Sequence, residues 1–152
     1  MTFILRNILG IPVWTIGLVL AGHERSPLIF SPSLVAETIG WCLNLLGGLI
    51  VLLALNALQH RAAMPSMQDQ LIQHGLYARL RHPIHGGLLL MLAAFILLRP
   101  TRTLALAVAL AVVWIAMQSW LEERDLIQRM PAYRDYMKRV PRFLPRWYRP
   151  LE

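Results

Sequence analysis

The sequence has almost no cysteine: its 152 residues include a single one, Cys42, which lies inside an apolar block. One thiol builds neither a disulfide framework nor a cysteine-rich metal site. The sequence therefore excludes a disulfide-stabilised scaffold, and we interpret Cys42 as a small residue that packs between helices.

Acidic residues are also scarce, with 8 Asp and Glu against 15 Lys and Arg, which gives a formal net charge of +7. A basic balance of this kind can indicate nucleic-acid binding. Here the basic residues flank long apolar blocks, as they do in membrane proteins, and 57% of the chain is hydrophobic. That composition is too apolar for a soluble domain of this size, so the sequence predicts an integral membrane protein.

The familiar motifs of soluble enzymes are missing as well. The chain contains no nucleotide-binding glycine loop, no Walker lysine, no His-Glu-x-x-His and no Gly-x-Ser-x-Gly elbow. If the protein is an enzyme, its chemistry is expected on the polar surface formed by about the last seventy residues.

Four apolar blocks divide the chain and are expected to be helices. They cover residues 3–21, 34–58, 84–98 and 104–121. The first, second and fourth are long enough to cross ~30 Å of hydrocarbon at ~1.5 Å per residue, whereas the third reaches only roughly 22 Å. The first block has some features of a signal peptide, but it is long and Arg6 is its only early charge. We interpret it as a retained transmembrane helix.

The third block is bounded by Pro83 and Pro100. It is either a tilted span or half of a tight hairpin with the fourth block, turning at residues 99–102. The predicted fold is therefore all-α, a polytopic integral membrane protein with about four transmembrane helices. The third and fourth of these would form a tight hairpin, followed by a short helical cytosolic tail.

The tail contains a second, shorter helical pattern. A helix there places Tyr133, either Tyr136 or Met137, and Val140 on one face and the charged residues on the other. The domain assignment is a single membrane domain over 1–152, with an N-terminal helical pair over 1–60 and the chemistry over 70–145.

The basic residues also predict the orientation. Arg25, Arg99 and Arg102 lie on one side of the expected spans, and all the other lysines and arginines lie on the opposite side. By the positive-inside rule, both termini and the 60–83 loop are cytoplasmic in a multi-pass protein. The basic and aromatic residues of the tail suit contact with the anionic headgroups of the inner leaflet.

The segment over residues 74–87 is the most informative part of the chain. Pro83 is well placed as the first residue of the third helix, with His82 at or near its cap. The free backbone N–H groups of that first turn, together with Arg79, Arg81 and His82, predict an anion site for a carboxylate or a phosphate. Arginine and histidine beside a membrane also bind lipid headgroups, which is the alternative interpretation.

His82 and His85 are three residues apart and can in principle ligate a metal ion. No further His or Cys follows at helical spacing, so no metal site is predicted.

A second polar segment, residues 118–125, lies where the fourth helix leaves the membrane. Carboxylates near a bilayer boundary are costly unless they are paired, so Glu122 and Glu123 are candidates for function. The alternative is an ion pair with Arg79 or Arg81 that only docks the loop, although such a pair would also form a polar pocket.

With both segments in view, the sequence resembles the membrane methyltransferases related to isoprenylcysteine carboxyl methyltransferase and phospholipid N-methyltransferases. Their signature is Gly-x-Tyr, Arg-His-Pro-x-Tyr-x-Gly, a helical hairpin, a Glu-Glu pair and a Tyr-x-x-Tyr tail ending in prolines. Its counterparts, in the same order, are Gly75-Leu-Tyr77, Arg81-His82-Pro83-Ile84-His85-Gly86-Gly87, Glu122-Glu123, Tyr133-x-x-Tyr136 and Val140-Pro141.

The resemblance implies S-adenosylmethionine as the methyl donor, bound near the cytosolic face. The residues it assigns to donor binding are Tyr77, Arg81, His82, Pro83, His85, Gly86, Glu122 and Glu123, and those it assigns to catalysis are Arg81, His85 and Glu122. One position departs from the signature, because its second tyrosine is His85 here. For an amine or alcohol acceptor, His85 or a glutamate would be the general base.

The implied acceptor is a lipid or a small molecule that partitions into the membrane. Two other functions are compatible with the sequence. An NADPH-dependent sterol-type reductase shares a similar Arg-His-Pro pattern but is usually longer, and a non-catalytic scaffold or lipid-binding protein would keep only the fold. Gly47 and Gly48 would also permit packing against a second copy of the chain.

Overall fold

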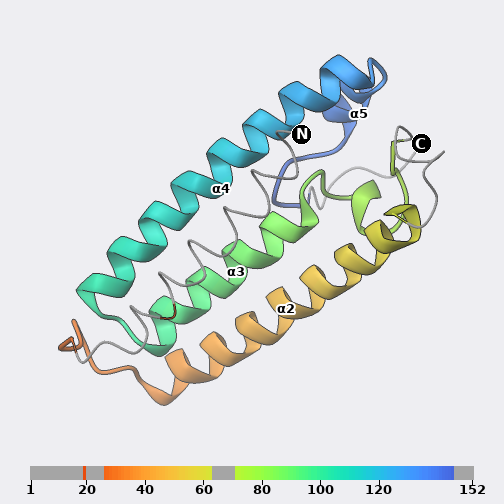
Figure 1. Ribbon diagram of the computed structural model, residues 1–152. Coiled ribbons are helices and arrows are strands. Elements are labelled where there is room, and N and C mark those ends of the chain that lie inside the picture. Colours follow the sequence, from red (N-terminus) through yellow and green to blue (C-terminus); the bar gives the residue numbers. More distant parts are fainter. Residues whose placement is uncertain (1–18, 20–25, 63–70, 146–152) are drawn as a thin grey trace. The chain divides into compact units, whose positions relative to one another are not determined.

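The structure is a computed structural model that describes Val19, residues 26–62 and residues 71–145. These residues form five helical elements and no β-strand. Figure 1 labels the α-helices among them. The elements are α2 (Leu34–Ala62), the 3₁₀ turn η2 (Gly75–Ala78), α3 (Pro83–Leu98), α4 (Arg102–Arg129) and α5 (Tyr133–Arg139). The all-α prediction is confirmed for this part of the chain, and the first apolar block lies outside it except for Val19.

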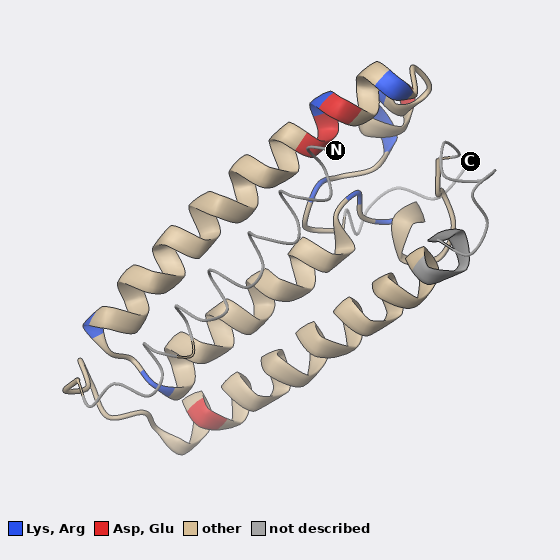
Figure 2. Ribbon diagram, viewed as in Figure 1, with Lys and Arg blue, Asp and Glu red and all other residues tan. Residues whose placement is uncertain are grey.

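Among the described residues, two helices are long and apolar enough to cross a membrane, through Leu34–Leu58 and Arg102–Arg129. Both carry their charged residues near their ends, and their long middle parts have none (Figure 2). They also leave large apolar side chains such as Leu45 and Leu110 well exposed, which water would disfavour and lipid would not. Helix α3 has 16 residues and is shorter than these two, so four spans remain a prediction.

The described residues divide into two compact units, one from residues 1–45 and 89–118 and the other from residues 46–88 and 119–152. In the first unit, Thr101 begins α4 as its cap, because its Oγ1 accepts a hydrogen bond from Leu104 N at 3.2 Å. The segment before α2 is held there too, since Ile29 N donates to Pro100 O at 2.7 Å. The connection between α3 and α4 is therefore short and well bonded, while their arrangement as a transmembrane hairpin stays a prediction.

In the second unit, α2 and α3 approach each other at two glycines. A Cβ built on Gly87 would lie 2.6 Å from Gly47 O and 2.8 Å from a methyl carbon of Val51. Only glycine at this position allows the two backbones to come so close.

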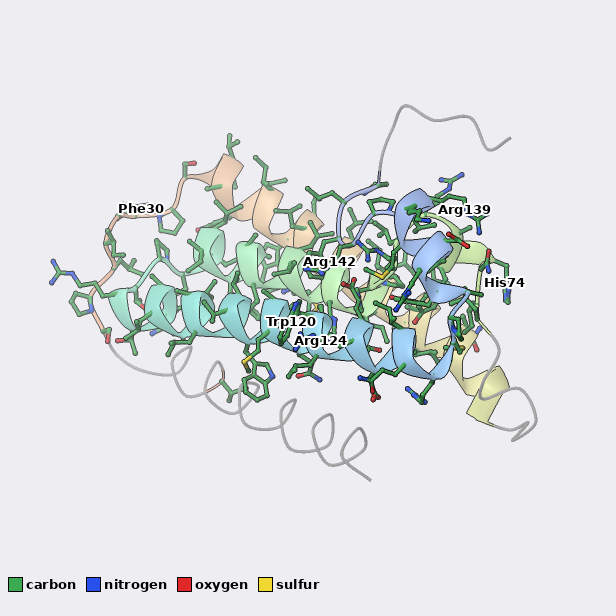
Figure 3. All side chains as sticks on the ribbon, turned by 90° about the horizontal axis from the view of Figure 1, so that it is seen from above. Phe30, His74, Trp120, Arg124, Arg139 and Arg142 are labelled. Atoms are coloured by element: carbon green, nitrogen blue, oxygen red, sulfur yellow. The ribbon has the colours of Figure 1, made fainter. Side chains whose placement is uncertain are left out.

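The tail helix predicted from the sequence is present as α5. It buries Tyr133 and Tyr136 in an apolar cluster that Val140 completes, packed against Leu71, Leu126, Ile127, Met130 and Met137. Its charged face is exposed, where Arg139 Nη2 donates to Gln73 Oε1 at 3.3 Å (Figure 3). The cluster fixes α5 against the end of α4 and the segment before η2.

Candidate functional site

The site belongs to the second unit and begins with the backbone between η2 and α3. Gly75 has a φ of +60°, in the left-handed region that glycine adopts without strain. Pro83 then opens α3, and the carbonyl of His82 accepts the first helical hydrogen bond from Gly86 N at 2.9 Å. His82 is therefore the N-cap, as the sequence indicates.

The tail runs back over this N-cap and is bonded to it. Arg81 N donates to Pro141 O at 2.9 Å, and His82 N donates to Arg142 O at 3.1 Å. We call residues 140–145 the tail strap. Within this strap, Phe143 comes so close to α3 that a Cβ on Gly86 would lie 3.3 Å from the Phe143 carbonyl oxygen. The strap therefore holds the Arg-His-Pro backbone in place.

Glu123, on the last turns of α4, pairs with the basic side chains around this backbone. Its side chain is only 4% exposed, with Arg81 Nη1 at 2.8 Å and His82 Nε2 at 3.1 Å from Oε1. Arg142 of the tail strap adds a bidentate contact, through Nε to Oε1 at 3.0 Å and through Nη2 to Oε2. A carboxylate buried this deeply needs such partners, because an unpaired charge would be very costly there.

His82 is held between two carboxylates. Its Nε2 faces Glu123, and its Nδ1 lies 3.4 Å from Glu122 Oε2. Burial alone would lower the pKa of His82, but the hydrogen bonds to Glu122 and Glu123 outweigh it and raise the pKa above 6.5. The two carboxylates therefore stabilise the protonated form of the His82 ring.

His85 stands one turn further along α3, beside His82. The two rings stack with centroids 5.4 Å apart. His85 Nδ1 is hydrogen-bonded to the hydroxyl of Ser119 at 2.9 Å, and Ser119 is fully buried. This bond fixes the ring orientation of His85.

Tyr77 closes another side of the cluster. Its carbonyl accepts a hydrogen bond from Tyr136 Oη at 2.5 Å, which ties η2 to α5. Burial, with the charge of Glu122 beside it, raises the pKa of Tyr77 well above its usual 10. The phenol of Tyr77 is therefore neutral and available as a hydrogen-bond donor.

The structure brings the residues named from the sequence into one cluster within this unit. Arg81, His82, His85, Glu122 and Glu123 are linked by the contacts above, and Pro83 and Gly86 lie buried in the first turn of α3 beside them. Arg79, which the sequence placed at the anion site, is exposed. Whether these residues bind a donor remains a prediction.

Two residues of the cluster were not assigned a role from the sequence. Arg142 is one of several arginines in the tail, and nothing in its spacing distinguishes it. Ser119 lies one helical turn before Glu123, so helical periodicity alone places these two residues on one face of α4, next to the face that carries Glu122. That spacing is a usable signal for Ser119, but no local signal exists for Arg142.

Comparison with known proteins matches the part of the chain that contains most of this cluster. Residues 35–130 match the phospholipid methyltransferase family. No curated protein and no solved structure matches the chain. The matched stretch covers more than half of the chain and includes the Arg-His-Pro turn, His85 and both glutamates. The chain therefore belongs to the phospholipid methyltransferase family.

Proposed function

We propose that the protein is an integral membrane methyltransferase that uses S-adenosylmethionine and acts on a lipidic or small membrane-partitioned acceptor. The observation that carries this proposal is the cluster of Arg81, His82, Glu122 and Glu123 at the polar ends of two apolar helices, in which His82 and Glu123 are buried. It lies inside the stretch that matches the family.

Arg81 supports a role in holding the donor's carboxylate. Its Nε is buried and has no hydrogen-bond partner among the described residues, whereas Nη1 lies 2.8 Å from Glu123 Oε1. Buried donors without acceptors are rare, and a carboxylate would supply the missing acceptor. The backbone N–H groups at the start of α3 would add to the same anion site.

The two glutamates differ in how far their side chains are exposed. Glu123 already faces Arg81, His82 and Arg142, so we assign it to positioning these side chains. The Glu122 side chain is 24% exposed and contacts His82 through one oxygen. Glu122 is therefore the better candidate to bind the donor's ammonium or ribose hydroxyls, and Tyr77, Pro83 and Gly86 would shape the surrounding wall.

The donor supplies an electrophilic methyl group on a sulfonium. Transfer of that group is an in-line displacement, so the protein mainly needs to orient both reactants and exclude water. For an amine or alcohol acceptor a proton must also be removed, and His85, oriented by Ser119, is placed to accept it. A lipid-tailed acceptor would present its head to the cluster while its chain stays among the apolar helices.

The topology that we propose is a multi-pass protein with both termini and the cluster on the cytosolic side. The side chains at the end of α4 support contact with the headgroup layer there. Arg124 lies 4.1 Å above the ring of Trp120, and both side chains are exposed (Figure 3). A tryptophan beside a cation is typical of membrane interfaces.

Donor binding can be measured directly by titrating the purified full chain in nanodiscs with S-adenosylhomocysteine in a calorimeter. We expect binding to the wild type, at least tenfold weaker binding to His82→Ala and Glu122→Gln, and unchanged binding to the control variants His74→Ala and Glu37→Gln. His74 and Glu37 are exposed residues of the same types outside the cluster.

Two other results would contradict the proposal. Binding of NADPH without binding of S-adenosylhomocysteine would favour a reductase. Binding of neither ligand by a folded sample would favour a scaffold or lipid-binding protein.

A further inference from the structure

We propose that His82, His85 and Glu122 also form a binding site for a divalent transition metal, with Zn²⁺ as the best match. Each of the three offers one ligand atom, and these atoms all lie within 4.8 Å of one another. The sequence alone did not predict such a site, because the third ligand comes from another helix.

The three residues supply a ligand set that suits zinc. Two imidazole nitrogens and one carboxylate oxygen form the three-ligand set of many zinc sites that keep an open fourth position. His82 and His85 lie at the start of α3, and Glu122 lies near the end of α4. Small rotations of the side chains would bring the ligand atoms to coordination distance.

A hydrogen bond to one ring nitrogen of each histidine provides an independent argument for a metal site. His82 Nε2 is bonded to Glu123 Oε1 at 3.1 Å, which leaves Nδ1 facing Glu122. His85 Nδ1 is bonded to Ser119 Oγ at 2.9 Å, which leaves Nε2. Histidines that bind metals nearly always have their other nitrogen held by a carboxylate, hydroxyl or carbonyl in this way.

Burial and the Glu122 carboxylate support a metal ion at this position, while Arg81 and Arg142 pair with Glu123. His82 is 5% exposed, and two carboxylates lie beside its ring. The Glu122 side chain is 24% exposed, which leaves an approach for an ion. Imidazole and carboxylate ligands favour zinc, copper or nickel over magnesium or calcium.

The site has a consequence for the proposed methyltransferase, and this part of the inference rests on the proposed function. His82, His85 and Glu122 are the residues assigned to the donor and to the acceptor's proton. A metal ion that occupies them excludes the donor, so zinc would act as a reversible inhibitor. The metal site itself does not depend on methyl transfer.

The test uses the full chain in nanodiscs, with any polyhistidine tag removed, and Co²⁺ as a visible probe displaced by Zn²⁺. We expect stoichiometric Co²⁺ binding by the wild type and by the control variant His74→Ala. Ser119→Ala should weaken binding about tenfold, as is usual for a residue that only supports a ligand. His85→Ala and Glu122→Gln should weaken it much further.

The variant His85→Tyr keeps an aromatic ring and a hydrogen-bonding group at this position but has no imidazole nitrogen, so it separates metal loss from misfolding. If His85→Tyr or Glu122→Gln binds Co²⁺ as tightly as the wild type does, the ligand assignment is overturned.

A second measurement separates the metal site from the donor site. Saturating Zn²⁺ should weaken the binding of S-adenosylhomocysteine at least tenfold in the wild type and leave it unchanged in His85→Tyr. Donor binding without any Co²⁺ binding would overturn the metal site and leave the methyltransferase proposal standing. Co²⁺ binding without donor binding would overturn the methyltransferase proposal and leave the metal site standing. Simultaneous binding of Co²⁺ and S-adenosylhomocysteine would show that the two do not compete for the site.

Discussion

Glu123 is 3% exposed, and three cationic side chains converge on it from two other segments of the chain. Two of them precede α3, and Arg142 comes from the tail strap. Loss of the glutamate would leave Arg81 and His82 buried beside each other without a common counter-ion. Single residues in this cluster therefore affect both the charge of the site and the packing of the tail.

The first prediction concerns Arg142. Arg142→Ala removes a bidentate contact to Glu123, and hydrogen bonds to charged groups contribute about 1.5–3 kcal/mol. Because the Arg142 side chain is 34% exposed, we expect a loss of about 1.5 kcal/mol in the free energy of unfolding. Denaturant titration in mixed micelles would measure it.

Arg142→Lys should recover part of that loss, since lysine keeps the charge but not the planar fork. Arg134→Ala, an exposed arginine on α5, serves as the control and should change stability little. Equal stabilities for the Arg142→Ala and Arg134→Ala variants would contradict the role given to the tail strap.

Among the helices, α2 and α3 depend on close backbone contact at Gly87. The second prediction is that Gly87→Ala destabilises the protein by about 1–3 kcal/mol, because its new methyl group would meet the carbonyl of Gly47. Gly48→Ala is the matched control, since nothing lies within 4 Å of a Cβ at that position. It should be neutral or stabilise α2 by about 0.5–1 kcal/mol. A Gly87→Ala variant as stable as Gly48→Ala would show that the helices do not meet there.

Helix α5 supplies a third prediction, which concerns alkaline pH. Burial raises the pKa of Tyr136 from 10 to about 12. A folded pKa above the unfolded one means that the stabilisation is fully present below pH 10 and is lost as the pH rises through about 12. The unfolding free energy of the wild type should therefore fall over this window.

Tyr136→Phe should show a shallower fall over the same pH window, measured by denaturant titration at several pH values. At neutral pH it should be about 1 kcal/mol less stable, because the carbonyl of Tyr77 loses its donor. Parallel pH curves for the two proteins would refute the assignment.

At the scale of the whole molecule, the fourth prediction tests the orientation. Cys42 is exposed on α2 within a candidate span, so lipid is expected to cover it. A membrane-impermeant maleimide should not label Cys42 in intact vesicles. In a Cys42→Ser background, Lys138→Cys should be labelled in inside-out vesicles and protected in right-side-out ones, because α5 is predicted to be cytosolic. The opposite labelling pattern would reverse the topology.

The sequence predicted the parts of the structure that follow from short spacings. Pro83 as the start of α3, the tail helix with Tyr133 and Tyr136, and two apolar spans depend on neighbours within a few turns. The pairing of Arg142 with Glu123 could not be predicted, because it joins residues 19 positions apart. The local sequence also does not distinguish Arg142 from the other arginines of the tail. The convergence of Glu122 with both histidines likewise requires the tertiary fold.

The tail strap also has a consequence for biosynthesis. Arg81 and His82 are made early, but their backbone partners Pro141 and Arg142 are made about sixty residues later. During synthesis α3 and α4 are therefore complete before Glu123 can meet its last partner, Arg142. The cluster can close only after Pro141 and Arg142 have been made, so a translational stall before Pro141 would leave a protein whose buried carboxylate still lacks its tail arginine.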